Sequence, residues 1–238
     1  MKRQFLLLCQ LAIAFFVQAQ KEIVVDPNAE LRSVSGSFSS IKVSGGFNLY
    51  LSQSADETVA VSASGERFKQ GIKTIVENGK LRIFYDGEKG LGIKNKKLKV
   101  YVSFKNIDKI EASGASDVFV TGSVNSNNLS LHLSGASEFK GAVKVNEFEN
   151  DLSGASDINI SGSALSVRIA SSGASDIKGF DLGADVCNAT ASGASDINIT
   201  VNKELNAHAS GASNIFFRGE ALLKEVHSSG ASAVERKG

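Results

Sequence analysis

The sequence of 238 residues has no tryptophan, one proline, one methionine and two cysteines. Although glycine is plentiful at 23 residues, so little proline excludes a collagen or a proline-rich linker. Cys9 lies in an apolar leader, so the exported chain is left with Cys187 alone and has no internal disulfide. The fold must therefore be stabilised by apolar burial and by hydrogen bonds between backbone groups.

The sequence also has no large excess of positively or of negatively charged residues. The sequence has 26 Lys and Arg residues against 25 Asp and Glu residues, with a formal net charge of +1. This balance favours neither nucleic acid nor an anionic membrane surface as a partner. Apolar residues make up 42% of the chain and charged residues 21%, which is typical of a globular protein rather than a disordered one.

The first 19 residues are predicted to be a secretory signal peptide. Lys2 and Arg3 form a basic start, residues 5–17 are almost wholly apolar, and Ala19 ends a small-residue cleavage site. The apolar run is too short for a comfortable membrane span. We expect cleavage after Ala19, no membrane span in the mature chain, and export to the periplasm, the outer-membrane surface or the extracellular space.

The tetrapeptide Ser-Gly-Ala-Ser recurs seven times in the second half of the chain. Successive copies are 18–21 residues apart, and most intervals are close to 19. A glycine at the same place in every repeat predicts a tight turn with a positive φ or a close backbone approach, and the flanking serines can bond the turn backbone. The seven glycines are Gly114, Gly135, Gly154, Gly173, Gly193, Gly211 and Gly230.

Apolar and polar residues alternate around each turn, which is typical of strands with one buried side. A short strand cannot bury one side alone, but equivalent strands stacked in parallel share a continuous core. The pattern predicts an all-β fold, a parallel β-helix or flattened β-solenoid, because a propeller needs about 40 residues per blade. One inward position after the turn is occupied by Val118, Phe139, Ile158, Ile177, Ile197, Ile215 and Val234.

These patterns divide the mature chain into a linker over residues 20–32 and one domain over residues 33–238. Within the domain, residues 111–235 carry the regular repeats and residues 33–110 are a less regular version of the same architecture. A short helix or turn is expected within residues 66–77. Strands of the irregular part are expected at residues 38–43, 47–51, 59–62, 81–85 and 98–102.

An acidic residue follows most of the glycine turns. At a strand spacing of about 4.8 Å these carboxylates form a ladder of like charges, which repel one another. Capping of the turns by the carboxylates is the preferred interpretation, and a metal site for Ca²⁺ is the alternative; no other cofactor is expected. The ladder consists of Asp117, Glu138, Asp157, Asp176 and Asp196, and continues as Asn214 and Ala233.

Other side chains have both a structural and a chemical interpretation. Cys187 shares an inward position with apolar residues and is expected to be buried rather than nucleophilic. Phe119 and Phe216 are expected to face outward, where they pack under a loop or stack on sugars. Three histidines share one outward position, where polar surface is the simpler interpretation and a transition metal shared by the last two is the alternative. They are His132, His208 and His227.

The sequence resembles the head GIN domain family, which is described as putative auto-transporter adhesins of secreted Gram-negative proteins. The resemblance rests on residues 38–53 (FSSIKVSGGFNLYLSQ), on residues 79–83 (GKLRI) and on the repeated Ser-Gly-Ala-Ser-Asp turns, which occur in the family's order. It covers roughly residues 33–235. It implies a right-handed β-helix similar to pectin-lyase-like folds, no retained catalytic residues, and an adhesive role.

We therefore expect a non-enzymatic secreted or cell-surface module that binds a glycan or a surface protein through flat faces. One alternative is a polysaccharide-active enzyme of the pectin-lyase-like type, for which Asp157, Asp176 and Lys178 are the nearest catalytic candidates. Another is a periplasmic structural module without a ligand. The last coil shows no evident cap, so pairing with another chain into an oligomer is a further hypothesis, which the charges at residues 235–237 oppose.

Overall fold

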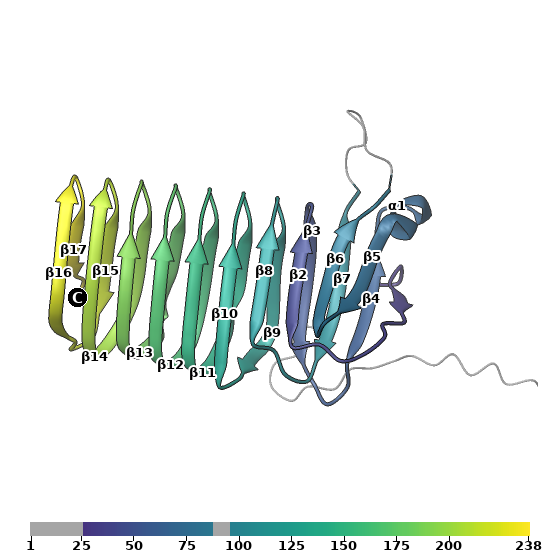
Figure 1. Cartoon of the computed structure of the whole chain (residues 1–238), viewed down its shortest axis with the longest axis horizontal. Helices are drawn as coiled ribbons and strands as arrows, with labels where there is room; N and C mark the ends of the chain where they lie inside the picture. The colour runs from purple at the N-terminus through teal and green to yellow at the C-terminus, as the bar shows by residue number, and fades with distance from the viewer. Residues whose placement is uncertain (1–25, 88–95) are drawn as a thin grey trace, which may run out of the picture.

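The computed structural model describes residues 26–87 and 96–238, and Figure 1 shows them as one row of stacked coils. The predicted signal peptide lies outside the described residues. Seventeen strands form a continuous sheet with one short helix, α1 (Glu66–Gly71), at one end of the stack. No helix in these described ranges is long and apolar enough to cross a membrane. The predicted all-β solenoid is confirmed, with about 7 turns.

Each regular coil contributes one strand to each of two broad faces, which we call face A and face B. A coil runs along face A, turns at the Ser-Gly-Ala-Ser motif, and returns along face B before entering the next coil. Face A contains β2 (Ser40–Ser44), β6 (Lys80–Tyr85), β8 (Lys109–Ser113), β10 (Asn128–Leu133), β16 (Leu222–Gly230) and the second halves of β11 (Glu138–Leu152), β12 (Asp157–Ser171), β13 (Asp176–Ala191) and β14 (Asp196–Gly211). Face B contains β3 (Phe47–Gln53), β7 (Leu98–Phe104), β9 (Asp117–Asn125), β15 (Asn214–Arg218), β17 (Ala233–Arg236) and the first halves of β11–β14.

Equivalent residues of successive coils lie opposite one another because the coils pair in parallel. Phe139 of β11, for example, pairs with Val118 of β9 on one side and with Ile158 of β12 on the other. The inward columns form one apolar core, in which these three side chains are at most 1% exposed. The predicted alternation of inward and outward residues is therefore confirmed through the regular repeats.

The repeated glycines stack into a ladder along one edge of the solenoid. All seven have φ between 77° and 82°, as a tight turn requires. The N–H of the following alanine donates to the glycine carbonyl of the preceding coil at 2.7–2.8 Å, as from Ala174 to Gly154. A Cβ atom at Gly173 would lie 2.4 Å from the carbonyl oxygen of Gly154. The turn thus requires glycine both for its backbone angle and for the approach of the next coil.

The serine that ends each motif closes the turn from inside. In six of the seven motifs its hydroxyl donates to the carbonyl of the first serine of the motif at 2.8–3.0 Å, as from Ser195 to Ser192 and from Ser137 to Ser134. In the remaining motif the Ser175 hydroxyl accepts from the N–H of Ser156 at 3.3 Å. The inner serines of the first six motifs are buried, at most 1% exposed, so the hydrogen bonds satisfy polar groups that water does not reach. The buried set is Ser116, Ser137, Ser156, Ser175, Ser195 and Ser213.

The first coils of the stack do not follow the order of the chain. The coil made of β2 and β3 lies between the β6–β7 coil and the β8–β9 coil, so it pairs in parallel with both. Beyond β6 and β7 the sheet continues in antiparallel strands: β5 (Ile72–Glu77) on β6, and β4 (Thr58–Ser62) followed by β1 (Glu30–Arg32) on β7. These strands close the end of the core that parallel pairing would leave open.

Two sequence expectations for this end are refined by the structure. The segment 66–77, expected as a helix or turn, is divided between α1 and β5. Residues 30–32 of the expected linker form β1 and are hydrogen-bonded into the sheet. All five strands expected in residues 33–110 are present, although β4 is antiparallel to its neighbours and both β2 and β3 are displaced from chain order.

At the other end of the stack, all of β16 is exposed and β17 is exposed or partly exposed, and the expectation that this end has no evident cap stays a prediction. Arg236 occupies an inward position opposite Phe217, lies 5.3 Å from its ring centroid, and donates to the carbonyl of Ala221 at 3.0 Å. An inward charge of this kind discourages pairing at a sheet edge. On β16, however, Leu222 and Leu223 are 59% and 45% exposed. Oligomerisation through this strand stays a prediction.

Candidate functional site

The predicted acidic residues form one column on the outer side of face B, which we call the acid column. Parallel pairing places each directly opposite the next, and the column begins opposite Asn48 of β3. All five carboxylate residues are partly exposed. The column is Asp117, Glu138, Asp157, Asp176, Asp196 and Asn214.

Two of the five carboxylates of the acid column, those of Glu138 and Asp196, are bonded by neighbouring side chains. Lys140 forms an ion pair with Glu138 at 2.7 Å, and the amide of Asn214 donates to Asp196 at 2.9 Å. Hydroxyl groups of the buried serines close the turns, and turn capping by the acids stays a prediction. Strand alternation points the acidic side chain outward, away from the turn, whereas the serine directly before it points inward.

The like charges of the column have a measurable electrostatic consequence at its first member. Burial raises the pKa of Asp117 above its ordinary value, and the carboxylate of Glu138 on the next coil raises it further, against a smaller opposing effect of Lys140. The described residues include no group of three or more His, Cys, Asp or Glu side chains arranged to hold a metal ion.

A second outward column runs beside the acid column, two residues further along each strand. Its first and last members are Phe119 of β9 and Phe216 of β15, and the residues between them carry ammonium or amide groups. We call the two columns together the face B grid. The second column is Phe119, Lys140, Asn159, Lys178, Asn198 and Phe216.

The second column continues past Phe119 as a stack of aromatic rings. The Tyr50 ring lies 5.3 Å from that of Phe119 and 5.0 Å from that of Tyr101, with interplanar angles of 22° and 14°. The Tyr101 hydroxyl donates to the Asp26 carboxylate at 2.8 Å. Burial, followed by this contact, raises the pKa of Tyr101. Phe119 therefore packs against an aromatic neighbour on one side only, and its other side faces the Lys140 coil.

Phe216 ends the column at the far coil. The Lys237 ammonium lies 4.2 Å from the centroid of its ring, a distance at which a cation is attracted to an aromatic face. Phe119 and Phe216 share one column as outward residues, but four coils separate them. They cannot hold the same sugar ring, and each instead borders one end of the polar grid.

The three residues nominated for polysaccharide cleavage are neighbours on this surface. Asp157 pairs directly with Asp176, and Lys178 follows on the same side of β13. They lie on the flat face, and neither of the two main hollows found among the described residues is lined by any of them.

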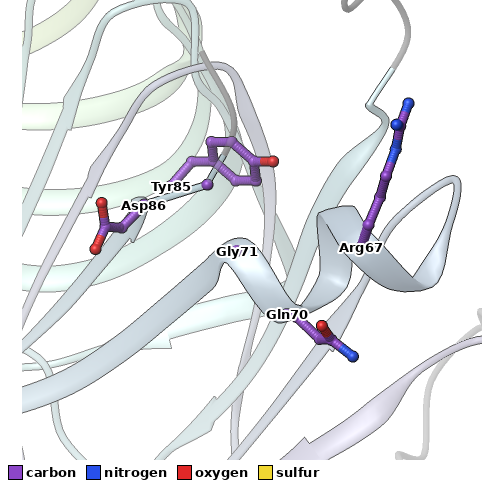
Figure 2. Close-up of a pocket in the computed structure, with 6 residues that line it drawn as sticks. Arg67, Gln70, Gly71, Tyr85 and Asp86 are labelled. Carbon is purple, nitrogen blue, oxygen red and sulfur yellow. The ribbon is translucent and has the colours of Figure 1, made fainter.

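One hollow, of about 320 Å³, lies at the capped end between α1 and the end of β6 (Figure 2). Figure 2 shows Tyr85 and Asp86 on one side of it and Arg67 and Gln70 of α1 on the other. The Tyr85 ring fits tightly against Gly71, where an added Cβ would lie 2.5 Å from it. The second hollow, about 300 Å³, lies on face A and is bordered by Glu147, Glu149, Arg168 and six other residues.

The three histidines do share one outward column on face A. His208 and His227 lie on adjacent coils with ring centroids 5.0 Å apart and an interplanar angle of 15°. His132 is instead 3.5 Å from Asp151 and 2.9 Å from the Ser130 hydroxyl. Cys187 is buried, and burial raises the pKa of its thiol to about 12, so the thiolate that a nucleophile needs is not formed near neutral pH.

A basic cluster that sequence reasoning missed lies on face A near the capped end. The ammonium groups of Lys42, Lys80 and Lys109 lie 3.4, 3.3 and 3.0 Å from the carboxylate of Glu111. The four residues come from three neighbouring strands, β2, β6 and β8. We call this group the lysine cluster.

Comparison with known families decides the family. The model of the family described as "Putative auto-transporter adhesin, head GIN domain" matches residues 37–221. The chain belongs to this family. The resemblance noted from the repeats and from residues 38–53 is thereby confirmed. Comparison with curated proteins gives no match.

Solved structures similar to this head GIN domain protein share its fold at low sequence identity. A putative adhesin from Bacteroides fragilis NCTC 9343 has a TM-score of 0.79 and 18% identity, over 88% of this chain and 96% of that one. A putative adhesin from Parabacteroides distasonis ATCC 8503 has a TM-score of 0.72 and 21% identity, over 88% and 96%. A protein described as a putative lipid binding protein from the same organism has a TM-score of 0.66 and 17% identity, over 90% and 98%.

In this head GIN domain chain, the sequence signal for the sites depended on the repeat. The acid column and the second column follow the period, so their members could be named in advance. The lysine cluster and the Tyr50–Tyr101 stack join segments from the irregular part, whose pairing has no period to reveal it.

The lysine cluster predicts a pH dependence of stability in this protein. Burial raises the pKa of Glu111, but the hydrogen bonds and charges of Lys109 and Lys80 outweigh it and bring the pKa down from 4.5 to about 2. A pKa lower in the folded state means that the ionised carboxylate stabilises the fold above about pH 4.5, and that this contribution is lost as the pH falls toward 2. Glu111→Gln should therefore lower the melting temperature at pH 6, and the difference from the wild type should shrink steadily between pH 4.5 and pH 2.5 in calorimetric scans. An equal difference at all these pH values would contradict the assignment.

Proposed function

We propose that this head GIN domain protein is a non-enzymatic, exported surface module that binds a glycan through the face B grid. The adhesin description of the family and of the similar structures supports a surface-binding role. The observation that carries the glycan assignment is the grid itself: carboxylates in one column beside amides and ammonium groups in the next, on an open flat face. The predicted signal peptide supports export, to the periplasm, the outer-membrane surface or the extracellular space.

The chemistry of the grid matches that of a chain of sugars. Carboxylates accept hydrogen bonds from hydroxyl groups, ammonium groups donate to them, and amides do both. Coils stacked about 4.8 Å apart repeat this pattern at even intervals, so the five steps from Phe119 to Phe216 span about 24 Å. Phe119 presents one ring side at the edge of the grid, where the apolar face of a sugar can pack against it.

An extended grid favours binding by many modest contacts rather than by one enclosed pocket. The members of the acid column are partly exposed and those between the two phenylalanines are fully or partly exposed, so they reach a ligand without rearrangement of the backbone. A surface protein with complementary charges is the other ligand class that such a face accommodates, and the experiment below separates the two.

The test begins with a glycan array probed with the mature chain, followed by calorimetric titration of the best ligand. Asp157→Ala combined with Asn159→Ala removes one carboxylate and one amide from the centre of the grid, and we expect the Kd to rise by about tenfold. The matched control is Glu149→Ala combined with Asn188→Ala, which removes the same groups from the outer side of face A. That control should leave the Kd unchanged.

Three results would contradict the glycan assignment. Equal losses in both double variants would place the ligand elsewhere, and an array without any bound glycan would favour a protein ligand. Cleavage of a uronic-acid polymer, lost in Asp157→Ala and in Lys178→Ala, would support the pectin-lyase-like enzyme instead. Titrations repeated with Ca²⁺ and with a chelator show whether the acid column binds its ligand directly or through a cation.

A further inference from the structure

Three ammonium groups on face A surround a single carboxylate. Glu111 is the only acid within 4 Å of the Lys42, Lys80 and Lys109 ammonium groups among the described residues, and its side chain is 18% exposed. One negative charge thus holds three positive charges within hydrogen-bond range. Two positive charges remain without compensation at this point of the surface.

The neighbouring Arg82–Glu77 pair leaves this excess of two positive charges unchanged. Arg82 lies directly beside Lys42 in the register of β6 and β2, and its guanidinium pairs at 2.9 Å with Glu77 at the rim of the capped end. Counted together, four basic side chains face two acids over these strands. Like charges on adjacent strands repel, so such a group is stabilised when an anion lies over it.

An unpaired hydroxyl lies within the same cluster. Ser40 pairs with Lys80 on one side and with Lys109 on the other, and alternation with the buried Ile41 places it on the outer side of β2. Ser40 is 9% exposed, and its Oγ has no hydrogen-bond partner. A buried hydroxyl without a partner is uncommon, and an anion oxygen held between the two lysines would satisfy it where a shift of the neighbouring side chains uncovers the Oγ.

We propose that the lysine cluster, with Ser40, binds the anionic groups of an acidic polysaccharide. The three lysines come from successive strands of a flat sheet, which are about 4.8 Å apart, so their side chains can follow a linear polymer with repeated charges. A membrane is less well matched, because on β2, β5, β6 and β8 the one strongly exposed large apolar side chain is Ile75, at 39%. Carboxylate and sulfate groups offer the same acceptor oxygens to lysine.

This site is separate from the face B grid. The lysine cluster lies on face A and the grid on face B, so no side chain belongs to both sites. A protein with both sites would carry an acidic face and a basic face on opposite sides of a thin solenoid. The inference does not depend on glycan binding by the grid, and variants on one face leave the other intact.

The experiment titrates the mature chain with polygalacturonate, with heparin and with neutral dextran in low salt. The triple variant Lys42→Gln, Lys80→Gln, Lys109→Gln should bind the two acidic polymers about tenfold or more weakly than the wild type. The control changes the net charge equally at exposed positions away from the cluster: Lys144→Gln, Lys203→Gln, Lys224→Gln. It should change the Kd by less than about twofold at the same ionic strength.

Melting temperatures of both triple variants are recorded first. If the cluster variant fails to fold, Lys42→Gln alone is titrated, since Lys42 is the most exposed of the three at 50%; it should weaken binding by about threefold. Equal weakening by the cluster and control variants would overturn the proposal, as would binding of dextran as tight as that of heparin. Preference for double-stranded DNA or for anionic vesicles over both acidic polymers would overturn it as well.

Discussion

Gly173→Ala is expected to lower the free energy of unfolding by about 3–5 kcal/mol, which is a large effect for a substitution that adds one methyl group. Two costs combine at this position. The backbone has φ of 81°, which disfavours any residue with a Cβ. The new methyl would also lie 2.4 Å from the carbonyl oxygen of Gly154 and 3.0 Å from its nitrogen, both backbone atoms that are already hydrogen-bonded or closely packed. This steric clash can be relieved only if the two coils move apart.

Gly79→Ala is the matched control for this prediction. Gly79 has φ of 73°, but nothing lies within 4 Å of the Cβ that the substitution adds. It should therefore cost only the backbone strain, about 1–2 kcal/mol, when both variants are unfolded in urea. Equal losses in the two variants would show that the close approach of the coils is not what makes glycine necessary.

Phe139→Ala is expected to lower the free energy of unfolding by about 3–5 kcal/mol. Its side chain is fully buried and lies in an inward column between Val118 and Ile158. Removal of the ring leaves a cavity that the adjacent coils cannot close, because their spacing is set by backbone hydrogen bonds. In a solenoid each coil contacts only its neighbours, so the loss should be concentrated at the β9–β11–β12 interfaces.

The control for Phe139 is Leu165→Ala. Leu165 is 56% exposed on β12, so its truncation should change the free energy of unfolding by less than about 0.5 kcal/mol. Hydrogen exchange adds a second readout. In Phe139→Ala the amides of β9, β11 and β12 should exchange faster than they do in the wild type, whereas the amides of β15 should exchange at the wild-type rate. Loss of protection spread evenly over all coils would contradict the nearest-neighbour account.

The sequence predicted the regular half of the fold residue by residue because equivalent positions of successive repeats carry the same types of residue. Gly154 and Gly173 mark the turns, Phe139 and Ile158 mark the core, and the acid column follows from the same period. The period does not show which side chain closes the turn, because both a serine and an acid stand at its end. Asp157 follows the turn at an outward position, whereas the buried Ser156 directly before it reaches the carbonyl of Ser153 at 3.0 Å.

The irregular half could be predicted as strands but not as a topology. Nothing in residues 40–53 shows that they pair with residues 80–84 and 98–104 on one side and with 109–121 on the other. The lysine cluster depends on that arrangement, since Lys80 and Lys109 are both placed beside Ser40 by it. The sequence therefore shows each lysine of the cluster, but only the structure shows that the three lie close together.

The central claim is that stacked coils build an extended binding surface on face B, and its most direct test is the dependence of affinity on ligand length. Oligosaccharides of increasing length, derived from the best ligand of the array, are titrated calorimetrically against the mature chain. The account predicts that affinity rises with each added sugar until the ligand spans the roughly 24 Å grid, and that further sugars add nothing. An affinity already complete with one or two sugars, and unaffected by Asp157→Ala with Asn159→Ala, would contradict it.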